Sequence, residues 1–180
     1  KLESLKICSE LILQGKVVGS LLSNSETGPR ALGNRSLICD GLNLKAVTYL
    51  NTVLKNRSPF RPTAPAMKIN TAEQYYELKS ELYQSYFSMN STCNCLDPKA
   101  KNFPITHIDG TARIQIVEKG SILFQLLDIL QPKGIEILAN SSLNLSGDPT
   151  CFDLIDVLMF CSLSPLEYLI TDIGLIKKLV

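Results

Sequence analysis

Apolar and polar positions follow two different spacings along this chain, and the two spacings predict helices and strands in turn. The helical spacing of three and four residues marks the ranges 1–14, 43–55, 121–130 and 153–161. Short apolar runs predict strands at 16–22, 36–39, 113–117, 135–139 and 168–170. Helices and strands that alternate in this way predict an α/β domain, in which strand directions can be mixed.

Turn-forming and capping residues predict what joins these elements. Asn43 and Thr150 are expected to cap the helices after them, and Thr71 with Gln74 matches a capping box that would begin a helix reaching Leu82. Three connections are predicted: a loop at 23–33, a proline-rich stretch at 58–65 and a polar surface loop at 85–102. We expect the 180 residues to form a single domain.

Composition narrows the class of protein. A hydrophobic content of 45% with 19% charged residues is ordinary for a globular chain, and the longest apolar runs are far shorter than a membrane span of about 20 residues. No secretory signal is visible, so we expect a cytoplasmic protein that binds no membrane. The formal net charge of +1 gives no electrostatic reason to expect a nucleic-acid partner.

Cysteine and histidine offer little for a metal site. The chain has six Cys and one His, and its only close Cys pair, Cys93 and Cys95, lies in the predicted polar loop. A zinc site needs about four such ligands at suitable spacing, so we expect no metal bound by the protein's own side chains. The pair is expected to be reduced and incidental, with a metal or redox role as the alternative.

Arginine is used selectively. Thirteen of the 18 basic residues are Lys and five are Arg, and two of the five, Arg30 and Arg35, stand in the segment GPRALGNRS beside Gly28 and Gly33. A charge needed for solubility can be Lys, whereas a planar fork that grips a phosphate or carboxylate through two hydrogen bonds must be Arg. Chance placement in an Arg-poor chain is the alternative.

Three further segments carry similar chemistry. KNRSPFRP adds Lys55, Arg57 and Arg61, and HIDGTAR adds Arg113 after His107 and Asp109. The third segment, NSSLNLSGDP from residue 140 to 149, follows a predicted buried strand, where α/β sheets present their ligand loops. Its hydroxyl and amide groups suit a nucleotide, although a polar turn and helix cap would account for them equally well.

In this order, the four segments resemble the carboxy-terminal domain of the O-carbamoyltransferases of the nodulation-protein and antibiotic-tailoring type, over about residues 15–173. The resemblance implies a YrdC-like α/β fold, a twisted mixed sheet flanked by helices. It also implies an activation step in which ATP, with Mg²⁺, and carbamoyl phosphate give a carbamoyl adenylate. An amino-terminal domain of actin-like fold, absent from these residues, would then transfer the carbamoyl group to an acceptor hydroxyl.

The resemblance also assigns roles to residues. Lys55, Arg61 and Arg113 would be catalytic. The residues expected to bind substrate or nucleotide are Arg30, Arg35, Arg57, His107, Asp109, Asn140, Ser142 and Asn144. His107 and Asp109 could instead only orient a neighbour.

Three features depart from the family pattern, and the first is the polar, Cys-containing loop at 85–96, where the family segment is more apolar. Ser23, Asn24 and Thr27 stand where relatives usually carry a Gly-Arg pair and an aromatic residue, and Leu143 replaces a usual Phe. These departures leave two alternatives open. One is a YrdC-like enzyme that activates threonine carbamate for tRNA modification, and the other is a nucleotide-binding module without turnover.

Overall fold

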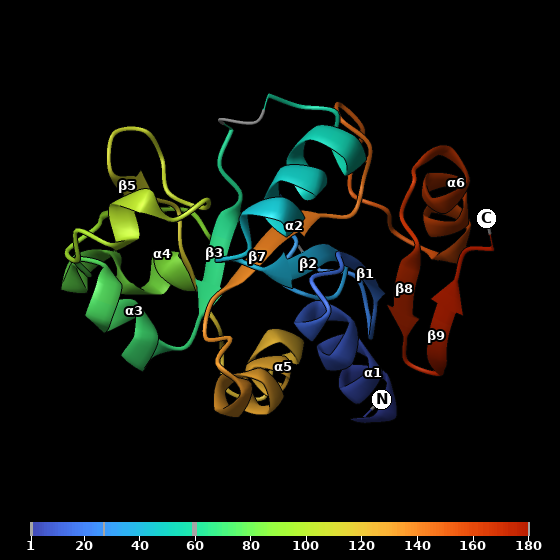
Figure 1. The fold of residues 1–180 in the computed structure, drawn as a ribbon, viewed down its shortest axis with the longest axis horizontal. Coiled ribbons are helices and arrows are strands. Elements are labelled where there is room, and N and C mark those ends of the chain that lie inside the picture. The colour runs from blue at the N-terminus through green and yellow to red at the C-terminus, as the bar shows by residue number, and fades with distance from the viewer. Residues whose placement is uncertain (1, 27, 59–60, 180) are drawn as a thin grey trace.

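A seven-stranded mixed sheet forms the centre of the protein (Figure 1). The computed structural model describes residues 2–26, 28–58 and 61–179. The strands lie in the order β6-β3-β7-β2-β1-β8-β9, with β1 parallel to β8, β3 parallel to β6 and the other neighbours antiparallel. Their bounds are β1 Val18–Leu21, β2 Ser36–Asp40, β3 Ala64–Met67, β6 Gln115–Ile116, β7 Leu138–Ser142, β8 Tyr168–Thr171 and β9 Gly174–Lys177. The predicted α/β class with mixed directions is confirmed.

Helices cover both faces of this sheet, and the strand sequences explain why. On β2, Ile38 faces helices α1 (Leu2–Leu13) and α5 (Ile122–Leu130), whereas Leu37 and Cys39 face the opposite core. That second core is covered by α2 (Leu44–Thr48), which continues directly into a π-helix at Tyr49–Leu54. Side chains alternate along a strand, so a strand buried on both faces reads as a continuous apolar run.

A smaller lobe packs beside β3 and corrects two expectations. It contains α3 (Ile69–Tyr75), α4 (Tyr83–Phe87) and a two-stranded sheet of β4 (Cys93–Asn94) and β5 (Thr111–Ala112). The predicted surface loop at 85–102 is therefore wrong, because Tyr86, Cys93 and Cys95 are buried in the core. The predicted capping box is also wrong, since α3 begins after Lys68 and leaves Thr71 buried within the helix.

Three predictions near the carboxyl end also need correction. Asp153, rather than Thr150, caps α6 (Leu154–Leu163) by accepting hydrogen bonds from two backbone N–H groups. The strand expected at 135–139 is β7, three residues further on, so Asn140 and Ser142 belong to the strand itself. Strands β3 and β9 were not expected, because proline in the first and the short polar turn before the second weakened their apolar pattern.

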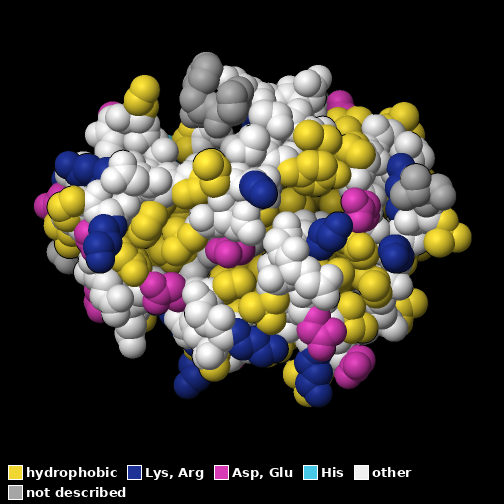
Figure 2. Space-filling model, viewed as in Figure 1, with side chains coloured by type: hydrophobic (Ala, Val, Ile, Leu, Met, Phe, Trp, Pro, Cys, Tyr) yellow, Lys and Arg dark blue, Asp and Glu magenta, His cyan; other side chains and the backbone are white. Residues whose placement is uncertain are grey.

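No helix in the described part of the chain is long and apolar enough to cross a membrane. On the face shown in Figure 2, the Lys and Arg side chains are scattered among other residues and do not gather into one patch. This distribution on that face agrees with a net charge close to zero.

Candidate functional site

One edge of the sheet collects the residues singled out in the sequence. Strand β7 ends at this edge and its neighbours β2 and β3 begin there, because Ser142 pairs with Ser36 and Asn140 pairs with Ala64. Strand β6 runs parallel to β3 and so begins at the same edge. The segments just before β2, β3 and β6 therefore converge with the end of β7, which brings together motifs that are far apart in the sequence.

Four arginines line one cavity at this edge, with a volume of about 170 Å³. They are Arg30 from the segment before β2, Arg57 and Arg61 from the segment before β3, and Arg113 from the segment before β6. Asn140, Ser141 and Ser142 of β7 complete the polar part of the wall. Six of the eleven residues expected in the site thus share one cavity.

The four guanidinium groups have no carboxylate partner. The ion pairs within residues 2–26, 28–58 and 61–179 are Lys16–Glu167 and Lys68–Asp128, and neither involves an Arg. Burial, followed by the charges of Arg61 and Arg113, lowers the pKa of Arg57 to about 10. Burial and the charges of Arg30 and Arg61 likewise lower the pKa of Arg113.

Unused donors point to the same conclusion. The Nε atoms of Arg30 and Arg113 are buried and have no hydrogen-bond partner among the described residues. Buried donors are normally satisfied, so a partly exposed cluster of like charges with two buried, open N–H groups is suited to an anion from outside the protein. Guanidinium groups match phosphate and carboxylate oxygens best.

Arg57 is held in place by neutral groups that the sequence did not single out. Asn51 Oδ1 accepts hydrogen bonds from Arg57 Nε at 2.8 Å and Nη2 at 2.6 Å, and Thr63 Oγ1 accepts from Nη2 at 3.0 Å. Asn51 lies in the π-helix and is fully buried. A polar residue on an otherwise apolar helix face was the available signal for this role.

A second cavity of about 480 Å³ adjoins the first and shares Pro29, Arg30 and Ser142 with it. Its remaining wall comes from two loops, and the residues that line it include Glu26, Asn144, Asp148 and Phe152. The two cavities together form one cleft, in which a cationic end opens into a larger polar space. That shape suits a phosphorylated ligand with an extended second part.

Lys55 supports this cleft from behind and lines neither cavity. It is 4% exposed, and its Nζ donates to Ser142 O at 2.9 Å, Asn144 O at 2.7 Å and Asn144 Oδ1 at 2.6 Å. Burial, followed by the charge of Arg57, lowers the pKa of Lys55 to about 8. In the described structure Lys55 therefore fixes the end of β7, and a direct catalytic contact stays a prediction.

Arg35 also lies outside both cavities, although its motif resembles an anion nest. All three of its guanidinium nitrogens donate to backbone carbonyls, including Phe152 O at 3.0 Å and Leu22 O at 3.1 Å. The nest is filled by Glu26, whose carboxylate accepts from the backbone N–H groups of residues 32, 34 and 35. Arg35 and Glu26 thus organise the loop that presents Arg30.

His107 and Asp109 belong to a turn that precedes β5. The turn closes through His107 N–H to Thr111 O at 2.8 Å, and the Asp109 carboxylate accepts from Thr111 Oγ1 at 2.7 Å. Burial lowers the pKa of His107, and the side-chain hydrogen bond from Thr111 lowers the pKa of Asp109. Neither residue lines the two cavities, so the turn's contribution is to aim the segment that carries Arg113.

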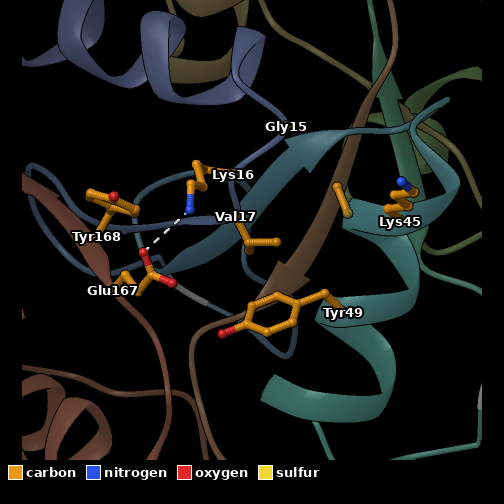
Figure 3. A pocket seen from close by; sticks show the side chains of 8 residues that line it. Gly15, Lys16, Val17, Lys45, Tyr49, Glu167 and Tyr168 are labelled. Atoms are coloured by element: carbon orange, nitrogen blue, oxygen red, sulfur yellow. Dashed lines mark hydrogen bonds and ion pairs between the residues drawn. The ribbon is translucent and has the colours of Figure 1, made fainter. Parts of the chain in front are cut away.

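A separate cavity of about 310 Å³ lies near the beginning of β1 and β8 (Figure 3). Lys16 and Glu167 face each other across it as a half-exposed ion pair at 3.5 Å, and Tyr49 projects from the π-helix toward the same space. Its wall holds one matched ion pair and one further cation, Lys45, whereas four guanidinium groups line the arginine cavity. Its demand for a ligand anion is therefore weaker.

The cysteines stay unremarkable. No group of three or more His, Cys, Asp or Glu side chains in the described residues could hold a metal ion. Cys93 and Cys95 are free and buried, and burial raises the pKa of Cys93 to about 12. Buried thiols of this kind are poor nucleophiles, and the incidental role of the pair stays a prediction.

The structure thus defines an α/β domain with a cavity lined by four arginines at one edge of its sheet. Comparison with known proteins makes this specific. Residues 9–178 match the family described as Carbamoyltransferase C-terminus, and the chain belongs to that family. The resemblance inferred from the four motifs is therefore confirmed.

Individual relatives agree with this assignment. The chain is 31% identical to nodulation protein NolNO of Sinorhizobium fredii over 94% of its own length and 25% of that protein. It is 32% identical to the 3'-hydroxymethylcephem-O-carbamoyltransferase of Streptomyces clavuligerus, over 85% of this chain and 29% of the relative. The chain thus spans only about a quarter to a third of these proteins.

Solved structures confirm the expected YrdC-like fold. Full-length HypF in its phosphate- and nucleotide-bound form matches 87% of this chain, and 23% of its own, with a TM-score of 0.64 and 18% identity. Sua5 of P. abyssi complexed with L-threonine matches 88% of this chain, and 44% of its own, with a TM-score of 0.63 and 16% identity. At these identities the likeness concerns the fold alone.

Proposed function

We propose that this chain is the activation domain of an O-carbamoyltransferase, which uses ATP and carbamoyl phosphate to make a carbamoyl adenylate. The observation that carries the proposal is the unpaired cluster of Arg30, Arg57, Arg61 and Arg113 at the end of a polar cleft. Family membership and the names of the relatives support a carbamoyl substrate. The solved HypF structure is described as phosphate- and nucleotide-bound, which supports a phosphorylated ligand for this fold.

The chemistry requires this kind of cleft. Hydrolysis of carbamoyl phosphate releases phosphate and leaves carbamate. A carbamate oxygen then attacks the α-phosphorus of ATP, the bond from that phosphorus to the bridging oxygen breaks, and pyrophosphate leaves. Two anions must come into contact in this step, and preorganised guanidinium groups lower its barrier by stabilising the charge on both.

The two cavities divide these tasks. The 170 Å³ cavity would hold the carbamoyl phosphate and the reacting phosphates on its four arginines. The 480 Å³ cavity would hold the rest of the nucleotide beside Ser142 and Asn144, whose positions are fixed by Lys55. Arg30 lines both cavities, so it is the residue placed to contact both substrates.

Magnesium fits this arrangement as a companion of the nucleotide. Glu26 and Asp148 are the carboxylates among the residues that line the larger cavity, and the Glu26 carboxylate is already bound to backbone N–H groups. Mg²⁺ commonly uses one or two protein carboxylates and completes its shell with phosphate oxygens and water. Asp148 with the ligand phosphates would hold the ion, which would neutralise phosphate charge.

Transfer to an acceptor would need a further domain, which we propose is the actin-like amino-terminal domain. The outer face of α6 supports such a partner, because six apolar side chains there and just before it are 48–70% exposed: Phe152, Leu154, Ile155, Leu158, Met159 and Leu163. Phe152 also lines the larger cavity. A docked domain on this face would meet the mouth of the cleft, and contiguous exposed apolar surface is typical of an interface.

The activation step can be tested with the chain alone. The purified protein is mixed with ATP, Mg²⁺ and carbamoyl phosphate, and phosphorus NMR follows AMP species and pyrophosphate. We expect pyrophosphate release that needs both substrates and is lost in Arg57→Met. Release that requires L-threonine and bicarbonate would indicate the threonine-carbamate alternative, and failure to bind ATP in calorimetry would contradict the proposal.

The docking face has its own test in a longer protein that carries both domains. The double variant Ile155→Ser, Met159→Ser should reduce carbamoylation of the acceptor while pyrophosphate release stays at the level of the unmodified protein. Equal carbamoylation by the variant and the unmodified protein would remove α6 as the interface.

A further inference from the structure

Asn140 differs from the rest of the cationic cavity because it presents an unpartnered acceptor. It lies on β7, which has β2 and β3 as its neighbours in the sheet, and it is 2% exposed. Its Oδ1 atom is buried and has no hydrogen-bond partner among the described residues. The same residue lines the 170 Å³ cavity beside the four arginines.

The orientation of this amide is fixed by its neighbours. Asn140 Nδ2 donates to Ala31 O at 2.9 Å and to Gln115 Oε1 at 2.7 Å. Gln115 is oriented in turn, since its own Nε2 donates to Leu32 O at 3.0 Å. Turning the Asn140 amide over would set its oxygen against two other oxygens, so Oδ1 must remain the unsatisfied atom.

The chemistry of the missing partner follows from the rest of the wall. Guanidinium groups are donors only and satisfy the oxygens of a phosphate. A ligand that satisfies a buried acceptor in the same wall would carry an N–H or O–H group next to its phosphate. Carbamoyl phosphate has such a group, the NH₂ of its carbamoyl end, whereas acetyl phosphate has a methyl group in the same place.

We propose that Asn140 is a specificity-determining residue that reads the carbamoyl amine, with Oδ1 accepting a hydrogen bond from it while the arginines hold the phosphate. This inference rests on the proposed function and extends it. When acetyl phosphate binds, Oδ1 stays buried without a hydrogen bond, and this cost disfavours the acetyl group. Such a cost discriminates more strongly than a difference in shape does.

The test is a comparison of three ligands by calorimetry: inorganic phosphate, acetyl phosphate and freshly dissolved carbamoyl phosphate. We expect the unmodified protein to bind carbamoyl phosphate about ten- to a hundredfold more tightly than acetyl phosphate. In Asn140→Ala this preference should shrink to about threefold or less, with the affinity for inorganic phosphate retained. Equal affinity of the unmodified protein for the two acyl phosphates would overturn the inference.

Two further variants distinguish a specific contact between Asn140 and the ligand from an effect on folding. Gln115→Met removes the acceptor that orients Asn140 and should reduce the preference, and it replaces the alanine variant if that protein fails to fold. Ser36→Ala is the matched control, because the Ser36 hydroxyl is also buried and unpartnered but does not line the cavity. A proportional loss of affinity for all three ligands in Asn140→Ala would show a purely structural role. If the unmodified protein binds neither acyl phosphate, the proposed function itself fails.

Discussion

Replacing Asn51 with Asp should make the protein more stable and a worse phosphate binder. Asn51 Oδ1 already accepts two hydrogen bonds from Arg57 and one from Thr63 Oγ1 at 2.9 Å. A carboxylate in the same place would keep these contacts and add a negative charge against four unpaired guanidinium groups. The substitution therefore places a negative charge of the protein's own beside the four guanidinium groups.

The size of the effect can be worked from Arg57. Burial first, and then repulsion from Arg61 and Arg113, lowers the pKa of Arg57 to about 10. This fall corresponds to about 3 kcal/mol, an upper figure because the side chain is partly exposed and solvent screens its charge. Recovery of about half of this, against the cost of burying a carboxylate, gives about 1–2 kcal/mol. For a chain of this length, that gain raises the melting temperature by about 2–8 °C.

Two measurements check this reasoning. Thermal unfolding by circular dichroism should show the higher melting temperature in Asn51→Asp, and calorimetry should show about a tenfold or greater loss of phosphate affinity. Asn70→Asp, an exposed change of the same charge in α3 beyond the far end of β3, is the control and should alter neither quantity appreciably. A lower melting temperature with unchanged phosphate affinity would refute the idea that repulsion among the arginines is held in reserve for a ligand.

Three other predictions follow from single residues. Arg61→Lys keeps the charge but loses the fork, so calorimetry should show about a tenfold loss of affinity for carbamoyl phosphate. Gly33→Ala should destabilise the fold by about 1–3 kcal/mol in urea titrations, because Gly33 has φ of +133° and an added Cβ would lie 2.9 Å from Leu123 Cγ. Lys55 has its pKa lowered from 10.5 to about 8. The unfolded chain therefore holds this proton between those values and the folded protein does not, so the stability of the unmodified protein relative to Lys55→Met should rise with pH across that window, by at most about 1.4 kcal/mol per pH unit.

Sequence reasoning succeeded where one pattern had one physical meaning. Helices α1 and α5 follow from unbroken apolar spacing, and the Asn43 side chain caps α2 by accepting a hydrogen bond from the Ala46 N–H, as expected. It failed where a residue's environment came from distant parts of the chain. Cys93 and Cys95 stand in a polar stretch, yet a pairing of β4 with β5, nearly 20 residues later, buries them.

The site was predicted in the same uneven way. Arg30, Arg57, Arg61 and Arg113 were selected by residue type and loop context, and the sheet edge brings them together. Lys55 and Arg35 satisfied the same criteria, but Lys55 donates to Asn144 O behind the cleft and Arg35 donates to Leu22 O beneath the loop. Nothing in a linear motif states which carbonyls a guanidinium will meet after folding. Thr27, Pro59 and Phe60, which belong to the quoted segments or departures, lie outside the described residues.

The contrast between Arg35 and Arg57 shows how the fold separates a structural arginine from a functional one. Both guanidinium groups are held by neutral oxygens, and neither pairs with a carboxylate among the described residues. Each of the three guanidinium nitrogens of Arg35 donates to a backbone carbonyl, and the side chain lines neither cavity, so this guanidinium holds the loop together. Arg57 is gripped through Nε and Nη2 by Asn51 and Thr63, which fix the plane of the guanidinium and leave its charge uncompensated. Under the proposed function, a neutral amide at residue 51 holds the Arg57 guanidinium in place for an incoming anion. A carboxylate there would hold the guanidinium equally well but would neutralise its charge.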